Sequence, residues 1–166
     1  MSEKKQTIYA LSTATGKSAI AVVRISGPKA YKYVKSISSS MPTKPNSSVT
    51  NILKDNRGEI IDKTVTTFFK APKSYTGEDM VEISMHGGST STNKFFEIFS
   101  KKKDARIAER GEFTKRAFEN NKIDLIQAEA IDDLIAAETE AQRRQAQNQL
   151  DGNFSNKTKK IFEKLK

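Results

Sequence analysis

Short runs of apolar residues, typical of β-strands, recur through the first two thirds of the chain. Residues 7–12 and 19–25 are such runs, and the second is nearly continuous in apolar residues, as in a strand buried on both faces. Residues 49–53 and 59–69 flank an Asp-Asn-Arg-Gly segment, which favours a hairpin because Asn and Gly tolerate positive φ. In residues 80–85 apolar side chains alternate with polar ones, which predicts a half-buried strand.

Helical spacing appears between these runs. Pro28 suits a first helical position, and the apolar residues after it repeat at helical intervals up to Ile37. Ser89 or Thr90 is predicted to cap a helix with an apolar stripe of phenylalanines. Residues 112–120 predict a further helix. Together these elements predict an α+β fold, a mixed β-sheet with helices.

The pattern changes at Asp124, which begins a long run without Gly or Pro that ends at Gly152. Apolar residues in this run step by three or four, and Asp124 with Gln127 forms a capping-box pattern. We therefore expect one long amphipathic helix over residues 124–152. A second helix, interrupted by the end of the chain, is predicted from Phe154, Ile161, Phe162 and Leu165.

Composition narrows the possible chemistry. The 166 residues include no cysteine and a single histidine, so thiolate chemistry, disulfides, zinc ribbons and a Ser-His-Asp triad have little support. No run is long and apolar enough to cross a bilayer, and we expect a cytoplasmic protein with no membrane association. Of the 29 Lys and Arg residues, 22 lie in residues 1–122 against 12 acidic residues. This excess fits an RNA-facing patch and an ordinary solvated surface about equally.

Several polar segments are candidates for chemistry. Residues 14–18 end in Gly-Lys-Ser, but Leu11 stands where a phosphate-binding loop requires glycine, so no nucleotide site is predicted there. Arg24 lies within the most apolar strand and needs a partner, either a carboxylate of the sheet or an anionic ligand. His86 is interpreted as a hydrogen-bonded structural residue rather than a metal ligand.

Five blocks of sequence, taken together, resemble one known family. They are Ala21-Val22-Val23-Arg24-Ile25-Ser26-Gly27-Pro28, Ser74-Tyr75-Thr76-Gly77-Glu78-Asp79 with Glu82, His86-Gly87-Gly88, the run from Gly111 to Phe118, and Ile123-Asp124-Leu125 with Gln127-Ala128-Glu129-Ala130. In this order and spacing the blocks closely resemble the tRNA-modification GTPase family called TrmE or MnmE.

The resemblance implies a tetrahydrofolate-binding and dimerisation domain over residues 1–121 and the start of a central helical domain over residues 122–166. It also implies that the chain stops before the GTPase domain. Carried over by motif position, the 5-formyltetrahydrofolate contacts are Arg24, Glu82 and Lys122. No catalytic or metal-binding residue is expected in this part, since GTP, Mg²⁺ and K⁺ belong to the GTPase domain. Ala14-Thr15 replaces the Pro-Pro that the family usually has before Gly16, which predicts a less rigid loop.

For the full-length protein the resemblance implies GTP-driven addition of an aminomethyl-type group at C5 of the wobble uridine of tRNA. The implied partners are tRNA, an FAD-dependent modification protein and a second copy of the chain. Two alternatives remain open: a basic tRNA-binding module without folate, and a self-contained folate-dependent one-carbon transferase.

Overall fold

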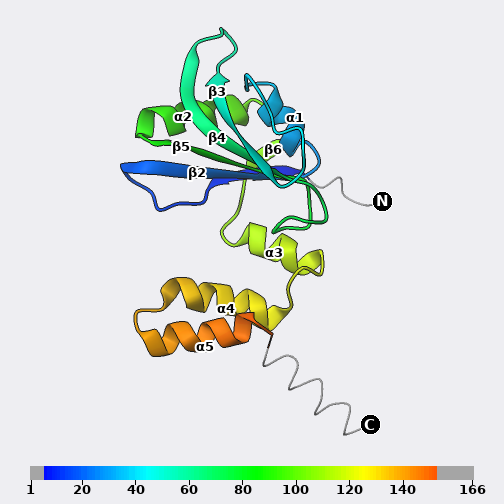
Figure 1. Ribbon diagram of the computed structural model, residues 1–166, viewed down its shortest axis with the longest axis vertical. Coiled ribbons are helices and arrows are strands. Elements are labelled where there is room, and N and C mark those ends of the chain that lie inside the picture. Colours follow the sequence, from blue (N-terminus) through cyan, green and yellow to red (C-terminus); the bar gives the residue numbers. More distant parts are fainter. Residues whose placement is uncertain (1–5, 153–166) are drawn as a thin grey trace, which may run out of the picture. The chain divides into compact units, whose positions relative to one another are not determined.

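The computed structural model describes residues 6–152, which fall into two compact units that divide between Phe113 and Thr114. A six-stranded sheet forms the centre of the first unit, with strand order β3-β4-β5-β2-β1-β6 (Figure 1). Every neighbouring pair is antiparallel except β1 and β6, which run parallel. The predicted α+β class with a mixed sheet is therefore confirmed. The strands are β1 (Thr7–Leu11), β2 (Ser18–Ser26), β3 (Ser47–Lys54), β4 (Ile60–Phe69), β5 (Met80–Gly87) and β6 (Ala105–Ile107).

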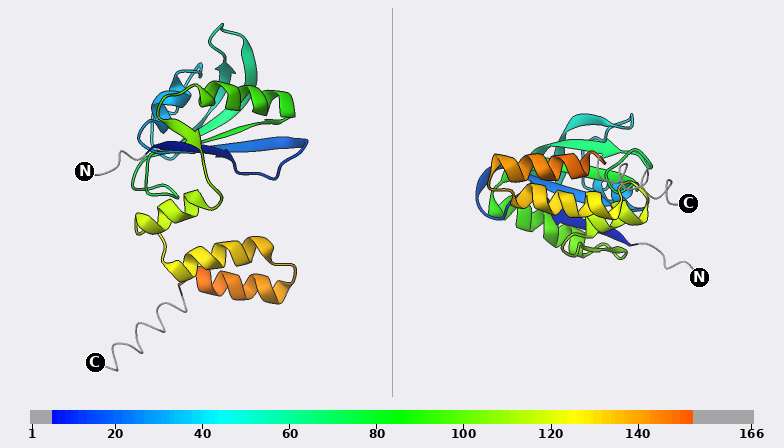
Figure 2. Two further views of the ribbon diagram at one scale, coloured as in Figure 1. Left: turned by 180° about the vertical axis from the view of Figure 1, so that it is seen from behind. Right: turned by 90° about the horizontal axis from the view of Figure 1, so that it is seen from below.

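Helices α1 (Ala30–Lys35) and α2 (Ser89–Ser100) cover one face of this sheet (Figure 2). Gly88 is the N-cap of α2, so the prediction that Ser89 or Thr90 caps this helix is wrong. The reason is that β5 continues to Gly87, two residues further than expected, and the helix follows at once. A Cβ on Gly87 would collide with Ser18 of β2, so this position needs glycine for close approach of the two strands.

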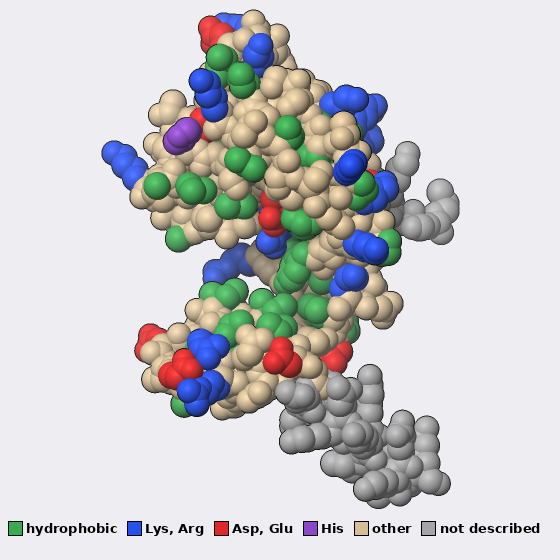
Figure 3. Space-filling view, in the orientation of Figure 1, with side chains coloured by type: hydrophobic (Ala, Val, Ile, Leu, Met, Phe, Trp, Pro, Cys, Tyr) green, Lys and Arg blue, Asp and Glu red, His purple; other side chains and the backbone are tan. Residues whose placement is uncertain are grey.

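The other face of the sheet, called here the open face, is covered by neither α1 nor α2, and Figure 3 shows hydrophobic side chains along it. Along β2, Ala21, Val23 and Ile25 are buried among the helices, whereas Ile20 on the open face is 61% exposed. The prediction that this strand is buried on both faces is therefore wrong. In an antiparallel sheet with helices on one side, alternate residues face opposite environments even when most of them are apolar.

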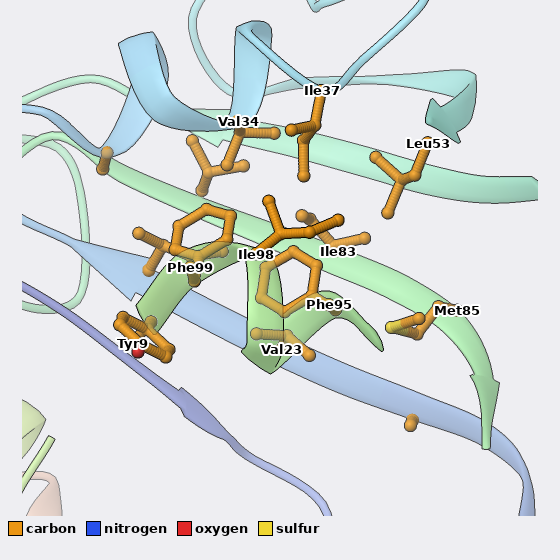
Figure 4. Packing of buried hydrophobic residues seen from close by; sticks show 14 of the residues in the cluster. Tyr9, Val23, Val34, Ile37, Leu53, Ile83, Met85, Phe95, Ile98 and Phe99 are labelled. Atoms are coloured by element: carbon orange, nitrogen blue, oxygen red, sulfur yellow. The ribbon is translucent and has the colours of Figure 1, made fainter. Parts of the chain in front are cut away.

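The core lies between the sheet and its helices (Figure 4). The rings of Phe95 and Phe99 on α2 stack with centroids 4.4 Å apart, and the ring of Tyr9 meets that of Phe99 edge-on at 5.2 Å. Val23 and Ile83 are fully buried. Burying an aromatic or branched side chain of this size stabilises the fold by about 1.5–3 kcal/mol each. This packing fixes β2 and β5, whose other side forms part of the open face.

Helix α3 (Glu112–Glu119) crosses the division between the units, and α4 (Leu125–Ala136) and α5 (Glu140–Leu150) belong to the second unit. Asp124 caps α4 with Gln127 as its capping-box partner, as predicted. The prediction of a single long helix over residues 124–152 is wrong. The chain leaves helical geometry at Ala137, and Thr139 caps a new helix, α5, with a second capping box. The helix predicted from Phe154, Ile161, Phe162 and Leu165 lies outside the described residues.

Candidate functional site

Arg24 and Glu82 form an ion pair on the open face. They lie directly opposite each other in the β2–β5 register, and Arg24 Nε donates a hydrogen bond to Glu82 Oε1 over 2.8 Å. Their side chains are 26% and 24% exposed, so both are accessible to a ligand. The sequence offered Arg24 two partners, a carboxylate of the sheet or a ligand. Glu82 is the sheet carboxylate, and the accessible position of the pair also allows a ligand to reach Arg24. Arg24 points out of the apolar core rather than into it.

Two aromatic rings flank the Arg24 guanidinium. Its Cζ lies 5.0 Å from the ring centroid of Tyr75 and 5.5 Å from that of Phe113, within the range of cation–π attraction. Sequence reasoning did not select these two residues, although both belong to motifs that it singled out. The sequence feature that could have identified them is the single aromatic residue in each of two polar motifs, Ser-Tyr-Thr-Gly-Glu-Asp and Gly-Glu-Phe.

The loop that carries Tyr75, residues 70–79, is fastened to the end of β2. Ser26 Oγ lies 2.7 Å from Thr76 Oγ1 and donates to Glu78 Oε2 over 2.8 Å. Thr76 is fully buried, and Gly27 N–H donates to the Asp79 carbonyl at 3.0 Å. These bonds hold the loop, and with it the Tyr75 ring, in a fixed place beside Arg24.

Phe113 is positioned by an ion pair at the start of α3. Arg106 donates from both terminal nitrogens to the Glu112 carboxylate, at 2.7 and 2.6 Å, and Glu112 is only 6% exposed. Donation of these hydrogen bonds to the Glu112 carboxylate raises the pKa of Arg106. Such a two-pronged contact fixes orientation as well as distance. Phe113, which follows Glu112 in the chain, is therefore held with its ring next to Arg24.

Lys122, the third predicted contact, lies in the second unit. Its backbone N–H donates to the Ala117 carbonyl at 2.8 Å, and Asn121 before it has φ of 55°, which closes α3 in a Schellman-type turn. The structure places Arg24 and Glu82 together, whereas the role of Lys122 stays a prediction.

His86 is held by a buried carboxylate. Its Nδ1 and its backbone N–H each lie 2.7 Å from an oxygen of Asp62, which is 9% exposed. The hydrogen bonding expected of His86 is therefore present, whereas its structural role stays a prediction. Within residues 6–152 no group of three or more His, Asp and Glu side chains is arranged to hold a metal ion.

An open groove of about 660 Å³ lies on the sheet near His86. Its lining is mixed: apolar side chains come from β2, β3, β4 and β5, and the polar ones are Ser39, Thr50, Asn51, Lys63, Thr64, Ser84 and His86. Because Glu82, Ser84 and His86 alternate along β5, they share one face, and the groove follows the same strand away from the Arg24–Glu82 pair. The surface thus combines a carboxylate acceptor, a guanidinium donor and apolar walls, which suits binding of a planar polar ligand.

Comparisons with known proteins cover nearly the whole chain. The family described as GTP-binding protein TrmE N-terminus matches residues 7–122, and the MnmE helical domain matches residues 125–166. A tRNA modification GTPase MnmE of Caulobacter vibrioides is 48% identical over 90% of this chain and 33% of its own length. Those of Clostridioides difficile and Roseobacter denitrificans are 44% and 43% identical, each over 96% of this chain. The chain spans about a third of the length of these relatives.

None of the described helices is long and apolar enough to cross a membrane.

Proposed function

The chain belongs to the MnmE (TrmE) family of tRNA modification GTPases, and from that premise we propose that residues 1–121 form a domain that binds a 5-formyltetrahydrofolate-type folate and dimerises. The observation that carries the proposal is the Arg24–Glu82 pair on the open face, flanked by Tyr75 and Phe113. In the full-length protein this folate supplies a one-carbon unit for modification of the wobble uridine. An FAD-dependent partner takes part, and GTP is hydrolysed by a separate domain.

The chemistry of Glu82 matches one edge of a pterin ring. That edge presents an amino group and a neighbouring ring N–H side by side, and a carboxylate accepts two parallel hydrogen bonds in this arrangement. Each carboxylate oxygen has two acceptor sites. The bond from Arg24 to Oε1 therefore leaves Glu82 able to accept from a ligand while it stays paired.

Arg24 supplies donors and positive charge for carbonyl and carboxylate groups of the same ligand. The Tyr75 and Phe113 rings stabilise the guanidinium without using its N–H groups in the plane. A site built this way holds its cation in place before the ligand arrives, which reduces the ordering cost of binding. Lys122 is included as a proposed folate contact because of its position in the family motif alone.

The dimerisation part of the proposal is supported by the exposed apolar side chains of the open face. Ile20 and Val65 are 61% and 43% exposed and lie on the groove that follows β5. Large apolar side chains gathered on one face are typical of protein–protein contact surfaces.

Calorimetric titration of the chain with 5-formyltetrahydrofolate tests the proposal. We expect saturable binding by the wild type and a loss of about 100-fold in Glu82→Gln, because the neutral amide replaces one acceptor with a donor. Arg24→Ala should also weaken binding. Glu59→Gln, at the exposed β3–β4 turn, is the matched control and should bind like the wild type.

A folded wild-type chain that gives no heat of binding would overturn the folate proposal. Sedimentation of the same samples gives the mass in solution. A ligand-saturated chain that stays monomeric would overturn the dimerisation part separately.

A further inference from the structure

Six lysines of the first unit lie in two segments, one at α1 and one in the turn after α2, and Lys102 joins the two. Lys29 is the N-cap of α1, and Lys32 and Lys35 lie within it. Lys101, Lys102 and Lys103 follow α2 in the turn that leads to β6. We call these six residues, with Tyr33 among them, the α1 lysine patch. Figure 3 shows Lys and Arg side chains gathered at the side of the first unit where α1 lies.

Direct contacts join the two segments. Lys102 Nζ donates to Ser36 Oγ, at the C-cap of α1, over 2.9 Å. The ammonium groups of Lys29 and Lys102 lie 5.9 and 5.7 Å from the ring centroid of Tyr33. Residues about seventy positions apart therefore form one surface, with an aromatic ring between cations.

The patch keeps an excess of positive charge. Lys29 pairs with Asp104, and Lys101 pairs with Glu97. Lys32, Lys35 and Lys103 are exposed and have no ion-pair partner within residues 6–152. Six ammonium groups thus face two carboxylates, and three of the six are available to an outside anion.

We propose that the α1 lysine patch docks the sugar–phosphate backbone of a structured RNA, in this family the tRNA to be modified. Lysines on a rigid helix and turn neutralise successive phosphates, and the release of counterions drives such binding. The Tyr33 ring adds a surface on which a ribose or base can pack. Charge complementarity favours RNA over an acidic protein, because the patch has exposed cations and one partly exposed ring but no apolar core of a protein interface.

The proposed RNA surface and the proposed folate site lie on different faces of the sheet. The patch lies on the face of the sheet covered by α1 and α2, whereas Arg24 and Glu82 lie on the open face. RNA and folate therefore bind the same domain together without competing. This inference goes beyond the folate proposal and does not depend on it.

Fluorescence polarisation of labelled tRNA against the purified chain, over a salt series, tests the patch. The patch variant carries Lys32→Gln, Lys35→Gln and Lys103→Gln, which change exposed side chains only. Losing three phosphate contacts should lower the slope of log affinity against log salt by about 2 and weaken binding at low salt by at least about 10-fold. The matched control carries Lys17→Gln, Arg57→Gln and Lys54→Gln, which remove the same charge from exposed positions outside the patch and outside the groove.

Wild-type salt dependence in the patch variant, or equal weakening in both triple variants, would overturn the patch as the RNA surface. Polyglutamate that binds as tightly as tRNA would overturn RNA as the occupant in favour of an acidic protein. The patch variant should keep wild-type affinity for 5-formyltetrahydrofolate, and loss of that affinity would overturn the separation of the two surfaces. Absence of folate binding in the wild type with patch-dependent tRNA binding would overturn only the folate proposal.

Discussion

Arg24 on β2 and Glu82 on β5 are register partners 58 residues apart, joined by a hydrogen bond of 2.8 Å from Nε to Oε1. Each side chain is about a quarter exposed, so water screens the pair only in part. The same pair connects two central strands and forms the proposed folate contact. Its contribution to stability can therefore be measured separately from its contribution to binding.

A double-mutant cycle with Arg24→Gln and Glu82→Gln should give a coupling free energy of about 1 kcal/mol, between the values for exposed and buried pairs. Urea unfolding followed at the amides of β2 and β5 measures it. The exposed pair of Lys101 and Glu97 is the control and should couple more weakly, because water and salt screen exposed charges more completely. Equal coupling in the two pairs would show that partial burial gives Arg24 and Glu82 no advantage.

Phe113→Leu should weaken folate binding about fivefold, because without the ring the Arg24 guanidinium is less ordered before the ligand arrives, and ordering it on binding costs about 1 kcal/mol. Calorimetric titration measures the effect. Phe113→Tyr keeps the ring and should retain near-wild-type affinity. If the leucine variant binds as well as the tyrosine variant, the ring does not position Arg24.

Asp62→Asn should lower the free energy of unfolding by about 2 kcal/mol. The Asp62 carboxylate accepts from the backbone N–H groups of Lys63 and His86 and from the His86 ring, and an amide nitrogen in place of one oxygen would face a donor. His86→Ala should cost less, because it removes one bond from a side chain that is 74% exposed. Urea denaturation of both variants tests this order, and the reverse order would contradict the role given to Asp62.

The first turn of α5 should respond to acid through Glu140. Hydrogen bonds from Arg143 and Arg144 lower the pKa of this carboxyl from its ordinary value of 4.5 to about 2. A carboxyl whose pKa falls on folding stabilises the folded state above its unfolded pKa and loses that effect as pH falls through its folded pKa. Protection of the α5 amides from hydrogen exchange should therefore decrease between about pH 4.5 and 2. Glu140→Gln should flatten this decrease, and added salt should reduce it because Glu140 is exposed.

Local sequence signals located most elements of this chain. Alternation found β5, the Asn-Arg-Gly segment found the β3–β4 hairpin, and Asp124 with Gln127 marked the start of α4. The break after α4 also had a local signal, since Thr139 and Gln142 repeat the capping-box spacing. It was missed because a run without Gly or Pro reads as continuous helix, although a capping side chain can begin a new helix within such a run.

The sequence by itself determined the α+β class, the family and the residue types that make up the proposed folate site. Only the tertiary structure decided that Arg24 faces Glu82 between two aromatic rings, and that Lys102 after α2 meets α1 at Ser36 and Tyr33. The physical reason is that helix caps, turns and alternation depend on residues a few positions apart. Strand order and register depend on how distant segments share one core, and that shared packing decides which charges meet on each face of the sheet.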